Sequence, residues 1–312
     1  MNQRRTRFSV APASEPVTDA AVDTGLRLAV EAAGRAPSMF STRPLHWRLV
    51  SHQLELRVDR DRALTAGDPH GRVLTLECGI ALDHALVALA ASGYWASVER
   101  LPADDVSGLM ARILPTGTYE PTASDARLLR AITERRAHQR RVSHTPVPNG
   151  TIDRLRRLAE GWGVYLTEVH AESLVEFHVL AARVDEPGQS RRDYPAEAAA
   201  SAHRLIPLRA LCPENRDFLL PGPGHDGSAR YLVLWSPRDD SASWLAAGEV
   251  TSTILLDGSV AELEVSPMGD VVETPISRTL VHSLLGNRGY AHAVLRIGMR
   301  VAEQPTLDLG RC

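Results

Sequence analysis

The sequence has 312 residues, of which 44% are hydrophobic and 23% are charged, a composition that excludes a largely disordered or fibrous chain. This length exceeds the usual size of one hydrophobic core, so we expect two domains or one duplicated unit. The formal net charge of −3 predicts no general attraction to nucleic acid or to an anionic membrane. All 35 basic residues are arginines, so a basic side chain that binds phosphate must do so through its guanidinium group.

The cysteines and histidines form no pattern that indicates a metal site. Cys78, Cys212 and Cys312 lie too far apart for a disulfide framework or a zinc site. There is no His-Glu-x-x-His motif, and His84 lies in an apolar helical stretch where a core role is the usual explanation. We therefore predict no metal. The sequence also lacks an uninterrupted apolar run of about 18 residues and an apolar signal segment, so we expect a cytoplasmic protein without a membrane partner.

In chain order, residues 1–18 show no periodicity and are interpreted as an N-terminal arm. Apolar spacing predicts a helix that starts at Thr18 or Asp19 and stops near Gly34, followed by a loop over residues 36–44. Residues 73–91 are apolar on nearly every helical face, which is typical of a helix buried all round. The alternating patterns beside it predict strands at residues 45–50, 54–59 and 94–101.

The rest of the chain continues as a mixture of helices and strands. Residues 185–228 are rich in proline and glycine and break the pattern, so we expect a lid there. Helices are predicted at residues 124–136, 151–160, 171–183, 244–261 and 277–285, and strands at residues 164–169, 231–235 and 292–298. This order indicates the α+β class.

A weak internal repeat links two of the predicted helices. Leu76-Glu77-Cys78-Gly79 matches Leu245-Ala246-Ala247-Gly248 at an offset of 248 − 79 = 169 residues, and each match belongs to an apolar helix that leads to a β-like segment. One repeat of this length indicates a duplication rather than a solenoid.

The densest candidate for binding an anion is Arg135-Arg136-Ala137-His138-Gln139-Arg140-Arg141, which follows a predicted helix. Guanidinium groups donate hydrogen bonds in a rigid fork that fits phosphate oxygens. The alternative is a solvated helix end, where arginines are favoured by the helix dipole. The residues of this cluster leave both interpretations open.

A family resemblance favours the phosphate interpretation. Several motifs occur in the same order as in the Acg family of nitroreductase-like flavoproteins, typical of actinobacteria, and together they extend from about Thr18 to Gly298. The motifs are Ala36-Pro37-Ser38-x-x-Ser41-Thr42-Arg43-Pro44 with Trp47, Asp68-Pro69-His70-Gly71-Arg72, Cys78-Gly79, Arg136-x-His138-x-Arg140 with Pro146-Val147-Pro148, Ser266-Pro267-Met268-Gly269 and Leu295-Arg296-Ile297-Gly298. Relative to the family pattern, the sequence departs at Ser41, Arg43, Leu45 and His138.

The resemblance implies a nitroreductase-like α+β fold in which a dimer has become one chain, a tandem fused pseudo-dimer with mixed sheets and central buried helices. The halves would be residues 19–128, with the Pro-Ser flavin loop, and residues 129–312, with the basic cluster and the lid. Together they would form one FMN site. No second Ala-Pro-Ser loop follows the helix at residues 151–160, so the reciprocal site is expected to be lost.

The resemblance also implies which residues would hold FMN. The first half would supply the loop beside the flavin ring, and the second half would supply the ribityl and phosphate contacts and the backbone near flavin N5. The residues of the loop are Pro37, Ser38, Ser41 and Arg43. The ribityl and phosphate contacts would come from Arg136, His138 and Arg140. The backbone near flavin N5 would be that of Pro267, Met268 and Gly269.

The function implied is an oxidoreductase that passes electrons from NAD(P)H through FMN to a nitro, quinone or pathway-specific acceptor, as a monomeric pseudo-dimer or a homodimer. No acid-base triad is required. Two alternatives remain: a protein that stores or sequesters FMN beneath the lid with little turnover, and a degenerate scaffold without a cofactor.

Overall fold

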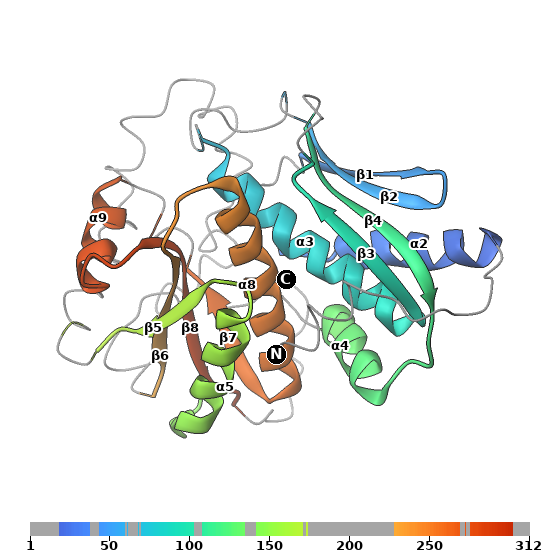
Figure 1. Cartoon of the computed structure of the whole chain (residues 1–312). Coiled ribbons are helices and arrows are strands. Elements are labelled where there is room, and N and C mark those ends of the chain that lie inside the picture. Colours follow the sequence, from blue (N-terminus) through green and yellow to red (C-terminus); the bar gives the residue numbers. More distant parts are fainter. Residues whose placement is uncertain are drawn as a thin grey trace, which may run out of the picture.

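The structure, a computed structural model, describes residues 19–37, 44–59, 61, 68, 70–102, 108–134, 142–170, 173, 228–268, 272 and 275–301. Within these residues it contains six helices and two four-stranded sheets. The predicted α+β class is confirmed. Figure 1 shows two long central helices with one sheet on either side of them.

The first half forms a sheet with strand order β1-β2-β4-β3. The long helix α3 lies between this sheet and α2. The elements are α2 (Asp19–Ala33), β1 (Leu45–Val50), β2 (Gln53–Val58), α3 (Arg72–Ala91), β3 (Tyr94–Arg100), β4 (Leu109–Thr118) and α4 (Ala123–Glu134).

The second half repeats this arrangement. Its sheet has the order β5-β6-β8-β7, so a helix precedes the first strand and a long helix joins the second strand to the third in both halves. The second half adds α9 between its last two strands. The elements are α5 (Asn149–Glu160), β5 (Tyr165–Glu168), β6 (Arg230–Ser236), α8 (Ser241–Val260), β7 (Leu263–Pro267), α9 (Pro275–Leu284) and β8 (Tyr290–Met299).

All the strand pairs in the described part of the chain are antiparallel, so the described strands do not form the mixed sheets that were predicted. The topology explains this difference. Each long helix returns the chain to the edge of its sheet, and the last strand then inserts between the second and third strands, running against both.

The central helices α3 and α8 cross where both carry a glycine. A Cβ atom at Gly79 would overlap the Leu245 carbonyl and lie 2.9 Å from the Gly248 Cα. Conversely, a Cβ atom at Gly248 would overlap the Leu76 carbonyl and lie 2.9 Å from the Gly79 Cα. Because these contacts are reciprocal and each pair is separated by 169 residues, an approximate twofold axis relates the two helices.

A buried polar contact lies close to this crossing. Ser252 donates a hydrogen bond to Asp83 Oδ2 at 2.6 Å, and the two residues are themselves separated by 252 − 83 = 169 positions. The side chain of His84 is buried beside them, with Nδ1 2.9 Å from Ser252 Oγ. His84 is therefore a hydrogen-bonded core residue, as predicted.

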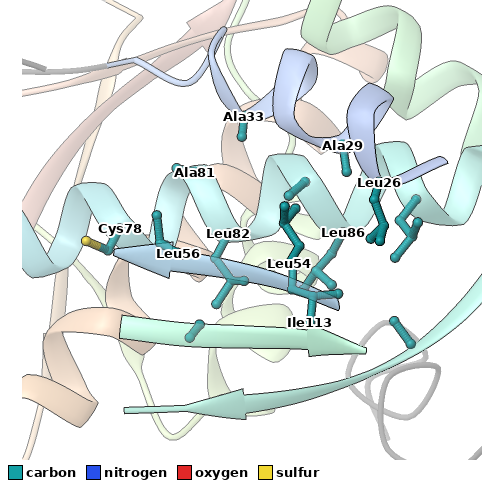
Figure 2. Packing of buried hydrophobic residues seen from close by; sticks show 14 of the residues in the cluster. Leu26, Ala29, Ala33, Leu54, Leu56, Cys78, Ala81, Leu82, Leu86 and Ile113 are labelled. Carbon is teal, nitrogen blue, oxygen red and sulfur yellow. The ribbon is translucent and has the colours of Figure 1, made fainter. Parts of the chain in front are cut away.

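The first hydrophobic core lies on both sides of α3. In Figure 2, Leu26, Ala29 and Ala33 of α2 approach α3 from one side, while Leu54, Leu56 and Ile113 of the sheet approach from the other. This burial explains why the sequence of α3 is apolar all round, and each fully buried leucine contributes roughly 1.5–3 kcal/mol. Leu245 of α8 belongs to the same core, so this core includes both halves.

By length and composition α3 could also cross a membrane, but its apolar window is wholly buried within the protein. This is the behaviour of a core helix.

Strand β4 was not predicted from the sequence. Pro115 and Gly117 interrupt its pattern, and both residues disfavour strands. The structure accommodates Pro115 because the pairing of β4 with β2 ends at Ile113. Pro115 therefore pairs with β3 alone, beside an irregularity in the register. The predicted helix at residues 171–183 and the predicted lid at residues 185–228 lie outside the described residues, apart from Ser173 and Ser228.

Candidate functional site

The structure describes three of the ten predicted flavin-binding residues. Pro37 is partly buried just after α2, and Pro267 and Met268 lie at the end of β7. The other seven lie outside the described residues, and their predicted roles remain untested: Ser38, Ser41, Arg43, Arg136, His138, Arg140 and Gly269.

The motif at residues 68–72 forms the start of α3. Asp68 Oδ2 accepts a hydrogen bond of 2.9 Å from the Leu74 N–H, which satisfies one of the free donors at the helix start. Gly71 has φ +67°, a left-handed conformation that favours glycine. This local geometry directs Arg72 into the protein, where it is buried.

Arg72 connects the two halves at this point. Its guanidinium donates to the backbone oxygen of His292 at 2.9 Å and to that of Val272 at 3.2 Å. Val272 lies just beyond Pro267-Met268-Gly269 in the chain, and His292 lies on β8, the strand that pairs with β7. The structure therefore brings two of the sequence motifs together, one from each half.

The segment at the end of β7 provides limited hydrogen-bonding capacity of its own. Proline has no N–H group, and the Met268 N–H donates to the Val294 oxygen at 2.7 Å. Neither Pro267 nor Met268 can therefore donate a backbone hydrogen bond to a ligand. If this segment donates to flavin N5, the donor must come from Gly269 or a later residue.

Two buried polar atoms beside this segment have no hydrogen-bond partner among the described residues, namely Ser266 Oγ and His292 Nδ1. Ser266 directly precedes Pro267, and His292 accepts Arg72 through its backbone. Buried polar groups in native proteins are normally satisfied by protein, solvent or ligand. The unsatisfied atoms therefore fit a site that takes a polar group such as the edge of a flavin.

The imidazole of His292 is neutral. Ser236 Oγ donates to the Arg238 oxygen at 2.7 Å, so it must accept a hydrogen from His292 Nε2, 2.8 Å away. Burial, and next the positive charge of Arg72, lower the pKa of His292 from 6.5 to about 4. No local pattern in the sequence indicates this cluster, because His292 is separated by 56 residues from Ser236 and by 220 residues from Arg72.

The two residues that follow the basic cluster in the chain pair with the end of β8. Val142, the next residue, forms an antiparallel bridge with Arg300, and the Ser143 N–H donates to the Met299 oxygen at 2.8 Å. Gly298 is required here because a Cβ atom would overlap the Val142 side chain. The glycine of the Leu295-Arg296-Ile297-Gly298 motif thus allows Val142 to pack on the end of β8.

The remaining sequence candidates have structural roles. Trp47 packs against the first core, and the Cys78 thiol is fully buried. Burial, together with the charge of Glu77, holds the pKa of Cys78 well above its usual value, so the thiol is poorly reactive. Among the described residues, no group of three or more His, Cys, Asp or Glu side chains could hold a metal ion.

Comparison with known proteins places the chain in a family, although no family model matches it. A Mycobacterium tuberculosis protein named "Putative NAD(P)H nitroreductase" is 33% identical over 298 residues, which cover 89% of this chain and 84% of the relative. The chain belongs to this nitroreductase family. A second relative from that organism, whose name adds "acg", is 29% identical over 303 residues, covering 88% of each chain, and confirms the predicted resemblance.

A solved nitroreductase from Bacteroides fragilis, with bound FMN, overlaps 59% of this chain and 96% of its own. The sequence identity is 10% and the TM-score is 0.38.

Proposed function

We propose that this protein is an FMN-dependent oxidoreductase of the nitroreductase type, which passes electrons from NAD(P)H to a nitro, quinone or pathway-specific acceptor. Membership of the family supports this function. The observation that carries it is the pair of hydrogen bonds from Arg72 to Val272 and His292, because they join the first half to the second beside the segment predicted to lie along the flavin. We also propose one site per chain in a cytoplasmic protein. The predicted boundary between halves at residues 19–128 and 129–312 falls inside α4, so we place the boundary after α4 instead.

When bound, FMN supplies the hydride and electron chemistry, and the chain binds and orients it. The loop at Pro37, Ser38, Ser41 and Arg43 would lie beside the ring. Arg136, His138 and Arg140 would hold the ribityl chain and phosphate, with charge-assisted hydrogen bonds worth roughly 1.5–3 kcal/mol each. On the other side of the proposed site, Arg72 fixes the backbone that follows β7 by donating a hydrogen bond to the Val272 oxygen.

The first test is the visible absorption spectrum of protein purified without added flavin, followed by mass spectrometry of any released cofactor. We expect a yellow protein that releases FMN and that NADH or NADPH bleaches under anaerobic conditions, with colour restored by a nitroaromatic or a quinone. A flavin that is bound but resists reduction by both nucleotides would favour the sequestering protein. A colourless protein that ignores added FMN would favour the scaffold without a cofactor.

A double substitution tests the phosphate contacts. Arg136→Ala with Arg140→Ala should abolish flavin retention and leave circular dichroism and the melting temperature nearly unchanged. The matched control is Arg154→Ala with Arg157→Ala, which removes two exposed arginines from α5. Full FMN occupancy in the folded Arg136/Arg140 variant would contradict the assignment of the basic cluster.

A further inference from the structure

A cavity of about 470 Å³ lies where the two halves meet, at the end of β3, the turn between α5 and β5, and the first turns of α8. Its wall includes Arg100, Leu101, Trp162, Val164, Ser243 and Leu245. Pro37, Pro267 and Met268, the predicted flavin-binding residues that the structure describes, do not line it. Its volume lies within the range of small-molecule sites, roughly 300–1,000 Å³.

The internal repeat explains the position of this cavity. The candidate flavin site involves the connection after α2, the start of α3 and the end of β7. The approximate twofold axis relates these elements to the turn after α5, the start of α8 and the end of β3, which are the three elements around the cavity. The cavity therefore occupies the position of the second flavin site in a symmetric dimer.

The shape of this second position differs from that of the first. Eleven residues, 34–44, connect α2 to β1 and contain the Pro-Ser loop, whereas only four, 161–164, connect α5 to β5. The short turn contributes Trp162 to the cavity wall. Because the loop expected beside a flavin ring has no counterpart here, the cavity suits a ligand smaller than FMN.

The two carboxylates at the cavity already accept hydrogen bonds, whereas the two arginines there can still donate to a ligand. The buried Glu249 carboxylate accepts two hydrogen bonds from Arg100, from Nε at 2.9 Å and from Nη2 at 2.7 Å. Asp240 caps the Ser243 N–H with Oδ1 and pairs with Arg238 through Oδ2 at 2.6 Å. Nη1 of Arg100 donates to none of the described residues, and the Arg238 side chain is 79% exposed.

The rest of the wall is apolar and partly aromatic. The Arg100 guanidinium lies 5.5 Å from the centre of the Trp162 ring, which fixes the orientation of both groups. Leu101, Val164 and Leu245 complete this surface. A ligand that matches the cavity would combine a flat apolar body with one anionic group.

We propose that this cavity is a second binding site, which takes a small planar aromatic carboxylate and no flavin. The carboxylate accepts hydrogen bonds from Arg100 Nη1 and Arg238, while the ring packs among Trp162, Leu101 and Ala246, which are all partly exposed. This site stands independently of the proposed flavin chemistry, because its wall contains none of the described residues of the candidate flavin site.

Calorimetric titration with benzoate tests the proposal, with uncharged benzamide as the matched ligand. We expect one benzoate per chain with a dissociation constant of about 1 mM or tighter, and benzamide at least about tenfold weaker. Arg238→Gln should weaken benzoate binding about tenfold, since it removes one charged donor from an exposed position. Arg130→Gln, which changes a similarly exposed arginine on α4, should leave binding unchanged.

A second variant fills the cavity. Ala246 lies in its wall and is partly exposed, so Ala246→Phe should abolish benzoate binding without changing the FMN content. Arg238→Gln keeps the test decisive if that variant misfolds. The proposal is overturned if wild-type protein binds no benzoate at millimolar concentration, if Arg238→Gln and Arg130→Gln bind it alike, or if the chain takes up a second FMN that Ala246→Phe excludes.

Discussion

Arg72 is the residue through which one half of the molecule fixes the functional segment of the other. Arg72→Met retains most of the apolar stem but leaves the backbone oxygens of Val272 and His292 without their donor. Two unsatisfied buried acceptors should lower the free energy of unfolding by about 2 kcal/mol or more, measured by urea denaturation at pH 7.5. Arg48→Met on the exposed face of β1 is the control and should change stability by less than about 0.5 kcal/mol. Equal effects from the two variants would contradict the role of Arg72.

His292 should make the stability of the protein depend on pH. Its pKa is about 4 in the folded protein, against an ordinary value of 6.5. Between these values the unfolded chain binds a proton that the folded protein excludes, so stability falls as the pH falls. The loss should reach about 2 kcal/mol between pH 6.5 and pH 5, since each pKa unit corresponds to about 1.4 kcal/mol.

The comparison with His292→Gln isolates this contribution. The glutamine amide can still donate to Ser236 Oγ, but it does not titrate in this range. Urea denaturation of both proteins between pH 7 and pH 5 should show the steeper decline in the wild type. Parallel curves would mean that His292 becomes protonated in the folded protein, contrary to its burial between Arg72 and Ser236.

At the scale of elements, the crossing of α3 and α8 depends on two glycines. Gly79→Ala or Gly248→Ala would place a methyl group against the backbone of the other helix, where rotamer changes offer no relief. We expect each substitution to lower the free energy of unfolding by about 1–3 kcal/mol, the usual cost of overpacking, and to lower the melting temperature. Gly150→Ala on α5 is the control, because nothing lies within 4 Å of its added Cβ atom. A wild-type melting temperature in the Gly79 and Gly248 variants would show that the helices can move apart freely.

The elements differ in how well the sequence predicts them. The two central helices could be predicted because they are buried on every face, so their composition alone distinguishes them. The offset of 169 residues even identified the residues that meet at their crossing. Strand β4 could not be predicted, because Pro115 disfavours a strand locally. The structure tolerates this proline only because β4 has no partner on its β2 side beyond Ile113.

At the scale of the whole molecule, contacts between the two halves could not be predicted from the sequence. The motifs at residues 68–72 and 266–269 could be recognised separately, but the hydrogen bonds that tie Arg72 to Val272 and His292, beside the second motif, span 200 and 220 residues of chain. The cavity also depends on residues that are distant in the sequence, since Arg100, Trp162 and Ser243 come from three separate elements of the two halves. No local pattern contains this information, because it arises only when the repeated halves pack together.

This shared packing predicts that the two halves unfold together. Leu245 of α8 lies in the first core, Leu256 of α8 packs with α2 and α4, and the buried Glu249 depends on Arg100 of β3. Separating the halves would expose these apolar surfaces and leave a buried charge unpaired. Calorimetry should therefore show one transition, with equal calorimetric and van't Hoff enthalpies.

Hydrogen exchange in the Gly79→Ala variant tests the same coupling locally. A substitution in α3 that destabilises a single cooperative unit should raise the exchange rates of slow amides in β2 and β6 by the same factor. The Gly150→Ala control should leave both strands unchanged. Faster exchange in β2 alone would show that the halves open independently, and the shared core would then contribute little to the stability of the second sheet.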